Sequence, residues 1–184
     1  MSQPSFVILE NSVLIIIDVQ EKLCRVMHEK DKLLDNLQKL IRGVQVLGMP
    51  VILAEQYPQG LGPTVPEIIS LLPNTQPIPR LSFSCCGEKR FLKELETLNR
   101  KQVLITGVES HVCIYQTTID LLNSGYELHV VTDCVSSRTP ENKKIALHRM
   151  NSAGAKLTSA EMVLFELLRV AGGEKFKAIS RIIK

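Results

Sequence analysis

A short, unbroken run of branched apolar residues constrains the fold of this chain more than any other feature. The stretch SVLIIIDVQ, residues 12–20, has no polar side chain from Val13 to Ile17 and reaches its first charged residue at Asp18. A run of this kind is typical of a strand buried on both faces of a sheet. Four other stretches predict further strands, at residues 50–54, 101–108, 126–133 and 155–159.

Segments with the apolar spacing of helices separate these strands. Leucine, isoleucine and valine recur every three or four residues across 31–47, which is the period of an amphipathic helix. Thr64 and Glu67 match a T-x-x-E capping box before a second, short helix. Strands that alternate with helices form a parallel sheet covered on both faces. We therefore predict an α/β fold of three layers, with about five or six parallel strands in a single domain over residues 1–184.

Composition excludes several classes of protein. The 184 residues are 45% hydrophobic, which suffices for a substantial core, and the net charge of +3 is spread without a basic face for nucleic acid. The apolar runs are too short to span a bilayer, and MSQPSFVILE lacks the features of a signal peptide. We therefore expect a cytoplasmic protein with no membrane partner.

The cysteines and histidines give no sign of a disulfide framework or a metal site. Five cysteines are an odd number and favour free thiols in a reducing compartment. No two histidines share the spacing of metal ligands. We expect neither a metal nor another cofactor.

Three chemically useful side chains fall near the ends of predicted strands. Asp18 ends the first strand, Cys113 begins the helix after strand 101–108, and Arg80 lies in the irregular stretch 74–91. Sites in open α/β sheets form beyond the carboxyl ends of the strands. Each residue also has a structural alternative: the aspartate can cap a turn, the arginine can be solvated, and the cysteine can be a small buried apolar residue. Their convergence at one sheet edge makes them candidates for a single site.

The position of Cys113 suits an activated thiol. The thiolate is the nucleophile, and a helix N-terminus lowers a thiol pKa, by an interaction of at most ~2 kcal/mol. A cation 4 Å away is worth roughly 4 kcal/mol at an effective dielectric near 20, so a neighbouring cation has the larger effect. A carboxylate raises the pKa of the thiol but can accept its proton as a general base. Such a site needs carboxylate, cation and thiol together.

Five stretches occur in the order of a known family over nearly the whole chain. They are LIIIDVQEKL (14–23), ILAEQYPQGLGPTVPE (52–67), LITGVESHVCIYQTTIDLL (104–122), VTDCVSSR (131–138) and SAEMVLFELL (159–168). They resemble the isochorismatase-like cysteine hydrolases, and EQYPQGLGPT is specific to the branch of small isochorismatase-domain proteins.

The resemblance implies a parallel sheet between helices and an Asp–Lys–Cys triad. Asp18 falls at the aspartate position and Cys113 at the nucleophile position, while Arg80 stands where the family has its lysine. The family also has a non-proline cis peptide bond, which here joins Val108 and Glu109. Its implied use is to aim the amides of Glu109 and Cys113 at one point, as an oxyanion hole.

The activity that the resemblance implies is hydrolysis of a small amide or related C–N bond through a covalent thio-intermediate. Asp18 then deprotonates Cys113 and returns the proton to the leaving nitrogen. Gln56 and Tyr57, in the loop after strand 50–54, are candidates for substrate binding. Nicotinamide-cleaving relatives carry an Asp/His metal cluster that has no counterpart in EQYPQGLG, so no metal is implied. The family implies homo-oligomers and a small-molecule substrate.

Arg80 leaves two hypotheses open. Arginine keeps the positive charge, but its planar, forked side chain is not equivalent to lysine. If Arg80 stands in for lysine, the protein is a cysteine hydrolase with an altered triad. If Arg80 clamps Asp18 in a fork, Cys113 is underactivated, and the protein is a weak or inactive member that binds a small molecule or partner in the same cavity. Cys85 and Cys86 are predicted to pack near the site.

Overall fold

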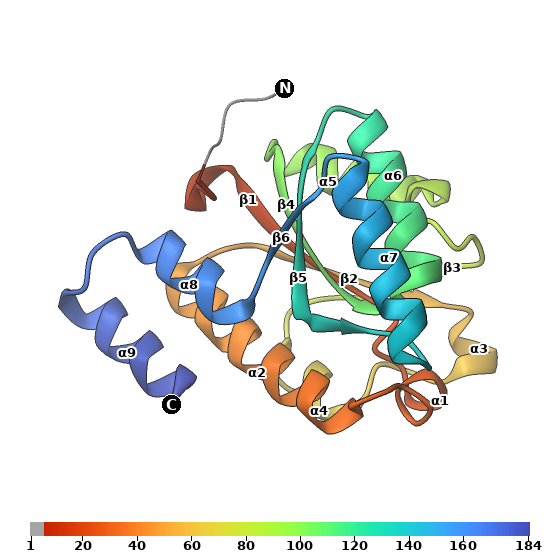
Figure 1. The fold of residues 1–184 in the computed structure, drawn as a ribbon, viewed down its shortest axis with the longest axis horizontal. Coiled ribbons are helices and arrows are strands. Elements are labelled where there is room, and N and C mark those ends of the chain that lie inside the picture. Colours follow the sequence, from red (N-terminus) through yellow and green to blue (C-terminus); the bar gives the residue numbers. More distant parts are fainter. Residues whose placement is uncertain (1–5) are drawn as a thin grey trace.

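The fold is built around one sheet of parallel strands (Figure 1). Its six strands have the order β3-β2-β1-β4-β5-β6. The computed structural model describes residues 6–184. The strands are β1 Ser12–Ile17, β2 Val51–Gln56, β3 Ile78–Arg80, β4 Gln102–Val108, β5 Glu127–Ser136 and β6 Lys156–Thr158. The α-helices are α1 Glu21–Cys24, α2 Lys30–Leu47, α3 Pro58–Leu61, α4 Pro66–Ile69, α5 Lys89–Thr97, α6 Tyr115–Asn123, α7 Pro140–Ser152, α8 Ala160–Leu168 and α9 Gly173–Ile183.

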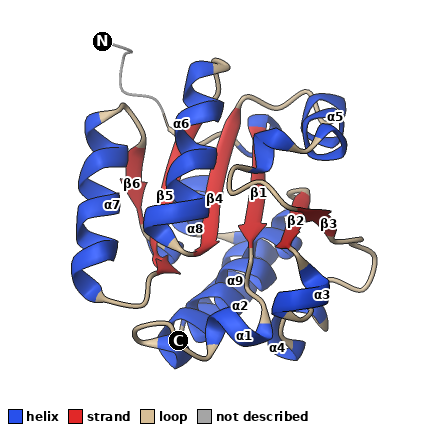
Figure 2. Ribbon diagram, turned by 90° about the vertical axis from the view of Figure 1, so that its right-hand side faces the viewer, coloured by secondary structure: helices blue, strands red, loops and turns tan. Residues whose placement is uncertain are grey.

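The predicted three-layer α/β fold is confirmed, because helices cover both faces of the sheet. Figure 2 shows α5, α6 and α7 on the near face, and α2, α8 and α9 pack against one another in the core of the other face. The predicted domain range of 1–184 includes residues 1–5, which lie outside the described residues. No helix within residues 6–184 combines the length and the apolar character needed to cross a membrane.

Alternate residues of the central strand β1 face two separate cores. Leu14 and Ile16 belong to the core with α2, α8 and α9, whereas Ile15 and Ile17 belong to the core with α5, α6 and α7. This alternation follows from the two-residue period of a strand. All four side chains are fully buried, and each contributes about 1.5–3 kcal/mol by leaving water. The unbroken apolar run that predicted this strand therefore serves two cores at once.

The short strand β3 lies in a stretch that the sequence predicted to be irregular. Its three residues pair with the end of β2, and Gln56 is opposite Arg80 in the register. Pro79 lacks an amide hydrogen, which an edge strand tolerates, and so short a segment shows no apolar period. This pairing fixes Arg80 at the carboxyl edge of the sheet, beside the end of β2.

The predicted capping box at Thr64 is wrong. The N-cap of α4 is Val65, and no side chain caps that helix. Thr64 instead donates from both its backbone N and its Oγ1 to Glu55 Oε1, each at 2.7 Å. The buried carboxylate of Glu55 at the end of β2 therefore binds the loop that returns from α3, and this distant acceptor outcompetes the local cap.

Gly107 lies where β4 passes closest to β1. Its φ is +110°, and a Cβ at this position would lie 1.9 Å from the carbonyl oxygen of Ile17. Only glycine fits so close a backbone approach with a positive φ. The peptide bond between the next two residues, Val108 and Glu109, is cis. The carboxyl edge of the sheet thus begins where regular strand geometry ends.

Candidate active site

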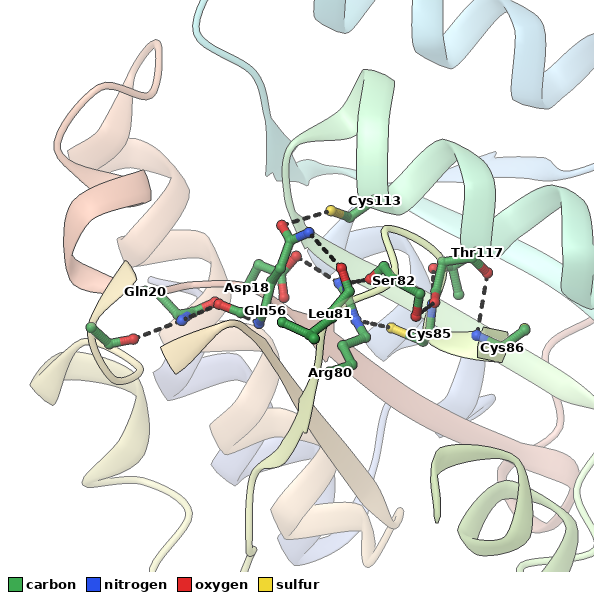
Figure 3. Close-up of polar contacts among 12 residues, drawn as sticks. Asp18, Gln20, Gln56, Arg80, Leu81, Ser82, Cys85, Cys86, Cys113 and Thr117 are labelled. Carbon is green, nitrogen blue, oxygen red and sulfur yellow. Dashed lines mark hydrogen bonds and ion pairs between the residues drawn. The ribbon is translucent and has the colours of Figure 1, made fainter. Parts of the chain in front are cut away.

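The structure brings Asp18, Arg80 and Cys113 together at the carboxyl edge of the sheet (Figure 3). Asp18 follows β1 with a positive φ of 56°, and Arg80 is the last residue of β3. Cys113 lies in a π-helical turn, Ser110–Ile114, that joins β4 to α6. All three side chains are buried. Residues that are far apart in sequence therefore meet in one enclosed polar cluster.

The guanidinium of Arg80 is held on three sides. Its Nη2 donates to Asp18 Oδ2 at 2.6 Å, its Nε donates to Cys85 Sγ at 3.2 Å, and its Nη1 donates to the carbonyl oxygen of Ser82. The side chains of Arg80 and Asp18 are 1% and 0% exposed. Only one oxygen of Asp18 binds Arg80, so the pair is not the two-oxygen fork that would occupy the whole carboxylate.

The second oxygen of Asp18, Oδ1, differs from the first in its hydrogen bonding. Among residues 6–184, no group makes a standard hydrogen bond to Asp18 Oδ1, although this atom is buried. Burial raises the pKa of Asp18, and Arg80 and the neighbouring thiol of Cys113 offset this only in part, so that the pKa is about 6. A carboxylate with a pKa near neutrality beside a thiol is equipped to accept and return its proton.

The surroundings of Cys113 favour the neutral thiol over the thiolate. Its side chain is buried, and the residue is 3% exposed. Burial raises the pKa of Cys113, the charge of Asp18 raises it further, and Arg80 lowers it without offsetting the other two. The expected gain from the cation and the helix start is therefore outweighed by desolvation. Thiolate must form as the proton leaves for a base.

Gln56 and Tyr57, the two candidates for substrate binding, have different surroundings. Gln56 Oε1 is 3.6 Å from Cys113 Sγ, and Gln56 Nε2 donates to the carbonyl oxygen of Leu81 at 3.4 Å. Tyr57 is exposed and lines a pocket of about 490 Å³ together with Arg80 and Leu81. Cys113 does not line that pocket.

The carboxylate of Glu109 forms hydrogen bonds with Arg138 and not with Cys113. Its Oε2 accepts hydrogen bonds from the backbone N and the Nε of Arg138, at 3.2 and 3.0 Å. The carboxylate is thus engaged with the β5–α7 loop, and only the backbone amide of Glu109 is left for the predicted oxyanion hole. The pairing of this amide with that of Cys113 stays a prediction.

Other titratable side chains in this part of the chain have clear places. His111 contacts Ser137 Oγ through Nδ1 at 3.0 Å. Lys89 and Lys93 are exposed on α5. Cys86 is half-buried, and all five cysteines are free thiols. Residues 6–184 bring together no group of three or more histidine, cysteine, aspartate or glutamate side chains that could hold a metal ion.

Two residues of the cluster escaped the sequence reasoning. Gln20 is fully buried, and its Nε2 donates to the carbonyl oxygens of Gln56 and Gly62 at 3.0 and 2.6 Å. Its place two residues after Asp18, past the end of β1, was a usable signal. Cys85 was predicted only to pack, and nothing in its sequence context indicated the contact with Arg80.

Comparisons with known proteins place this chain in a family. A model described as "Isochorismatase domain" matches residues 12–162. The secreted isochorismatase effector Isc1 of Phytophthora sojae is 38% identical over 95% of this chain and 85% of its own. The MAR1 ribonuclease of Caenorhabditis elegans is 35% identical, with a TM-score of 0.92 over 97% of this chain and 92% of its own.

A third relative is YcaC from Pseudomonas aeruginosa, solved with hexane-2,5-diol and covalent acrylamide. It is 27% identical, with a TM-score of 0.92 over 97% of this chain and 92% of its own. The six-stranded parallel sheet with helices on both faces and a buried polar cluster at its carboxyl edge is that of an isochorismatase-like hydrolase. The chain belongs to the isochorismatase family, in the branch of small isochorismatase-domain proteins.

Proposed function

We propose that the protein is a cysteine hydrolase that cleaves a small amide or related C–N bond through a covalent thio-intermediate. One observation carries the proposal. The carboxylate of Asp18 lies beside the thiol of Cys113, and one of its oxygens is fixed by Arg80, while the other is buried without a standard hydrogen-bond partner among the described residues. This arrangement supplies a nucleophile and a base whose orientation is set by a third group.

In the first step, Cys113 Sγ attacks the carbonyl carbon of the substrate and the thiol proton passes to Asp18. A new S–C bond forms, and the carbonyl oxygen becomes an oxyanion. The backbone amides of Glu109 and Cys113 stabilise this charge as an oxyanion hole. Because Asp18 has a pKa of about 6, it is largely ionised at neutral pH and ready for this proton.

In the second step, Asp18 returns the proton to the nitrogen of the substrate. The C–N bond breaks, the amine or ammonia leaves, and a thioester on Cys113 remains. Water then attacks the thioester while Asp18 takes one of its protons, and the acid product departs as the thiol re-forms. Asp18 serves as base, acid and base again, which suits a pKa close to the working pH.

Arg80 replaces the family lysine as the fixed positive charge. Its charge lowers the pKa of both Asp18 and Cys113, so it favours the ionised states that the reaction passes through. Because its Nε and Nη1 are satisfied by Cys85 and by Ser82, Nη2 is held in line with a single oxygen of Asp18. We propose that Gln56 and Tyr57 contact the substrate from the β2 side.

The experiment that tests this function is a screen of small amides, with ammonia or amine release as the readout and mass detection of an adduct on Cys113. We expect turnover and an adduct that Asp18→Asn abolishes. Arg80→Lys separates the two roles of the arginine, since a rise in turnover would make Arg80 an impaired substitute and a loss would make the site adapted to it. A Cys113 of ordinary thiol reactivity, with no turnover of any amide, would overturn the proposal. A labelled RNA belongs in the panel, because one relative is named a ribonuclease.

We also propose that the protein is a homo-oligomer within a reducing compartment such as the cytoplasm. Five free thiols support the compartment. Exposed apolar side chains on the edge strand β6 and on α8, at Leu157, Met162 and Phe165, support self-association. Light scattering that gives the mass of one 20.6 kDa chain at micromolar concentration would contradict the second part.

A further inference from the structure

A second pocket, separate from the cysteine site, lies between α1, α4 and the loop that leads to β3. Figure 2 shows α1, α3 and α4 gathered beyond the arrowheads of β1 and β2. The pocket has a volume of about 530 Å³, within the range of sites for small organic ligands. None of Asp18, Arg80 and Cys113 lines it. Any ligand held there is bound outside the proposed catalytic cluster.

The walls of this pocket are mainly apolar and rigid. They include four prolines and two aliphatic side chains, which are Pro63, Pro66, Pro73, Pro77, Ile69 and Leu72. Because the backbone φ of proline is fixed, such walls lose little conformational freedom when a ligand packs against them. The pocket is therefore shaped in advance for a small apolar body.

The carboxylate of Glu55 interrupts the apolar walls. Glu55 lines the pocket and is only 7% exposed. Within residues 6–184, both of its hydrogen bonds come from Thr64 and go to Oε1. Oε2 receives none from those residues, yet it is not one of their fully buried polar atoms without a partner, which are Asp18 Oδ1 and Thr118 Oγ1. Oε2 is therefore reachable from the pocket that Glu55 lines.

The charge of the pocket is one-sided. Glu21 on α1 brings a second, half-buried carboxylate to it. Among residues 6–184, no lysine, arginine or histidine lines the pocket or forms an ion pair with either glutamate. Glutamate is almost never buried to this extent unless it is paired, so the pocket favours a cation from outside the chain.

The donor set suits an organic cation better than a metal ion. Within residues 6–184, no group of three or more histidine, cysteine, aspartate or glutamate side chains could hold a metal, and Ca²⁺ and Mg²⁺ require about six or more oxygen ligands. An ammonium group needs only acceptors for its N–H donors. The carbon body attached to it gains by leaving water against the prolines.

We propose that this pocket binds a small primary ammonium ion with an apolar body, whose N–H group donates to Glu55 Oε2. The rigid apolar walls hold the body, and the buried carboxylate selects the charge. The assignment is independent of the proposed hydrolysis, because it uses none of the residues of the cysteine site.

The test is a titration of the protein with 2-phenylethylamine and with its neutral analogue 2-phenylethanol, followed by ¹⁵N–¹H NMR at neutral pH. We expect the wild type to bind the amine about tenfold or more tightly than the alcohol, the effect of one hydrogen bond to a charged group. The amides of Thr64 and Ile69, which line the pocket, should shift most. Equal affinities for the two compounds, or shifts centred on another part of the protein, would overturn the proposal.

Three variants separate the charge of Glu55 from its structural role. Glu55→Gln removes the charge but keeps an oxygen that can accept from Thr64, and it should weaken amine binding about tenfold or more without affecting the alcohol. Thr64→Val removes the Oγ1 donor but keeps the carboxylate, so its effect on amine binding should be much smaller. Glu10→Gln makes the same exchange at an exposed residue before β1 and should change neither affinity.

The variants give clear outcomes. If Glu55→Gln binds the amine as tightly as the wild type, or if Thr64→Val weakens binding as much as Glu55→Gln does, the carboxylate does not select the ligand and the proposal is wrong. Thermal melts check that each variant is folded. Should Glu55→Gln fail to fold, the preference of the wild type for the amine over the alcohol, with the shifts at Thr64 and Ile69, still decides the proposal.

Discussion

The middles of the central strands and their carboxyl ends obey different physical rules. In the middle of β1, burial stabilises, because Leu14 and Ile16 simply leave water. At its end, burial opposes the charged state, and the pKa of Asp18 rises to about 6 as a result. The partner that offsets this effect, Arg80, lies 62 residues away in the chain. The core in the middle of β1 thus follows from the apolar residues of one short stretch. The site instead depends on an ion pair between residues that are far apart in the chain.

The sharpest test of this contrast compares two buried cysteines. Cys113 lies at the carboxyl edge, whereas Cys134 lies in the core with α2 and α8. We expect Cys113→Ala to lower kcat/KM for the best amide substrate by about 10⁴-fold or more, as for other lost nucleophiles. Cys134→Ala should leave kcat/KM within about twofold and lower only the melting temperature, since it removes buried volume. Equal losses of activity would break the distinction.

A second comparison concerns two glycines with positive φ. A Cβ on Gly107 would meet the Ile17 carbonyl oxygen at 1.9 Å, whereas a Cβ on Gly48 would meet nothing within 4 Å. Gly107→Ala should therefore lower the free energy of unfolding by about 4 kcal/mol or more, and Gly48→Ala by only about 1–2 kcal/mol. Urea titrations of both variants measure the difference. Similar losses would show that β1 and β4 can separate locally at little cost.

The dependence of kcat/KM on pH tests the site at the carboxyl edge of the sheet independently of the core. Since Asp18 must be ionised to accept the proton of Cys113, kcat/KM should fall about tenfold per pH unit below pH 6 and level off above it. The folded-state pKa is raised above the ordinary value of 3.8, so Asp18 contributes stability that is present below about pH 4 and lost as the pH rises through 6. A profile of kcat/KM that stays flat between pH 4 and pH 8 would show that Asp18 is not the base.

The smallest expected effect is at Cys85, which positions Arg80. Burial raises the pKa of Cys85 to about 11, so its sulfur accepts the Arg80 Nε–H as a neutral thiol. Cys85→Ala removes this acceptor and should lower kcat/KM about two- to tenfold, the range of one net hydrogen bond. Cys85→Ser keeps an acceptor and should recover most of the loss. An alanine variant as active as the wild type, with an unshifted pH profile, would show that Cys85 only packs.

The contrast also explains what the sequence could predict. The run from Val13 to Ile17 predicts β1, since a period of apolar residues is visible in the letters. Asp18 and Cys113 were placed by the rule that parallel strands carry their sites at one edge. The resemblance to the family added Arg80, which stands at the position where the family has its lysine.

The remainder depends on partners that no local pattern reveals. The strand β3 cannot be predicted from apolar periodicity, because three residues around Pro79 are too few to show a period. Its position depends on its pairing with β2 in the folded sheet. Thr64 matches a cap by spacing, yet the buried Glu55 binds it instead. The raised pKa of Cys113 follows from the extent of its burial, which is a property of the whole fold.

The three contacts of Arg80 have a consequence for how such a site can change over generations. The side chain of lysine has only one nitrogen. An exchange of Arg80 for lysine therefore leaves Cys85 Sγ and the Ser82 carbonyl oxygen, which now accept from Nε and Nη1, without a donor. The opposite step, from lysine to arginine, needs those acceptors to be in place beforehand. The charge and its surroundings are therefore expected to be inherited as a unit, and ancestral intermediates that carry only half of the exchange should be poorer catalysts than either endpoint.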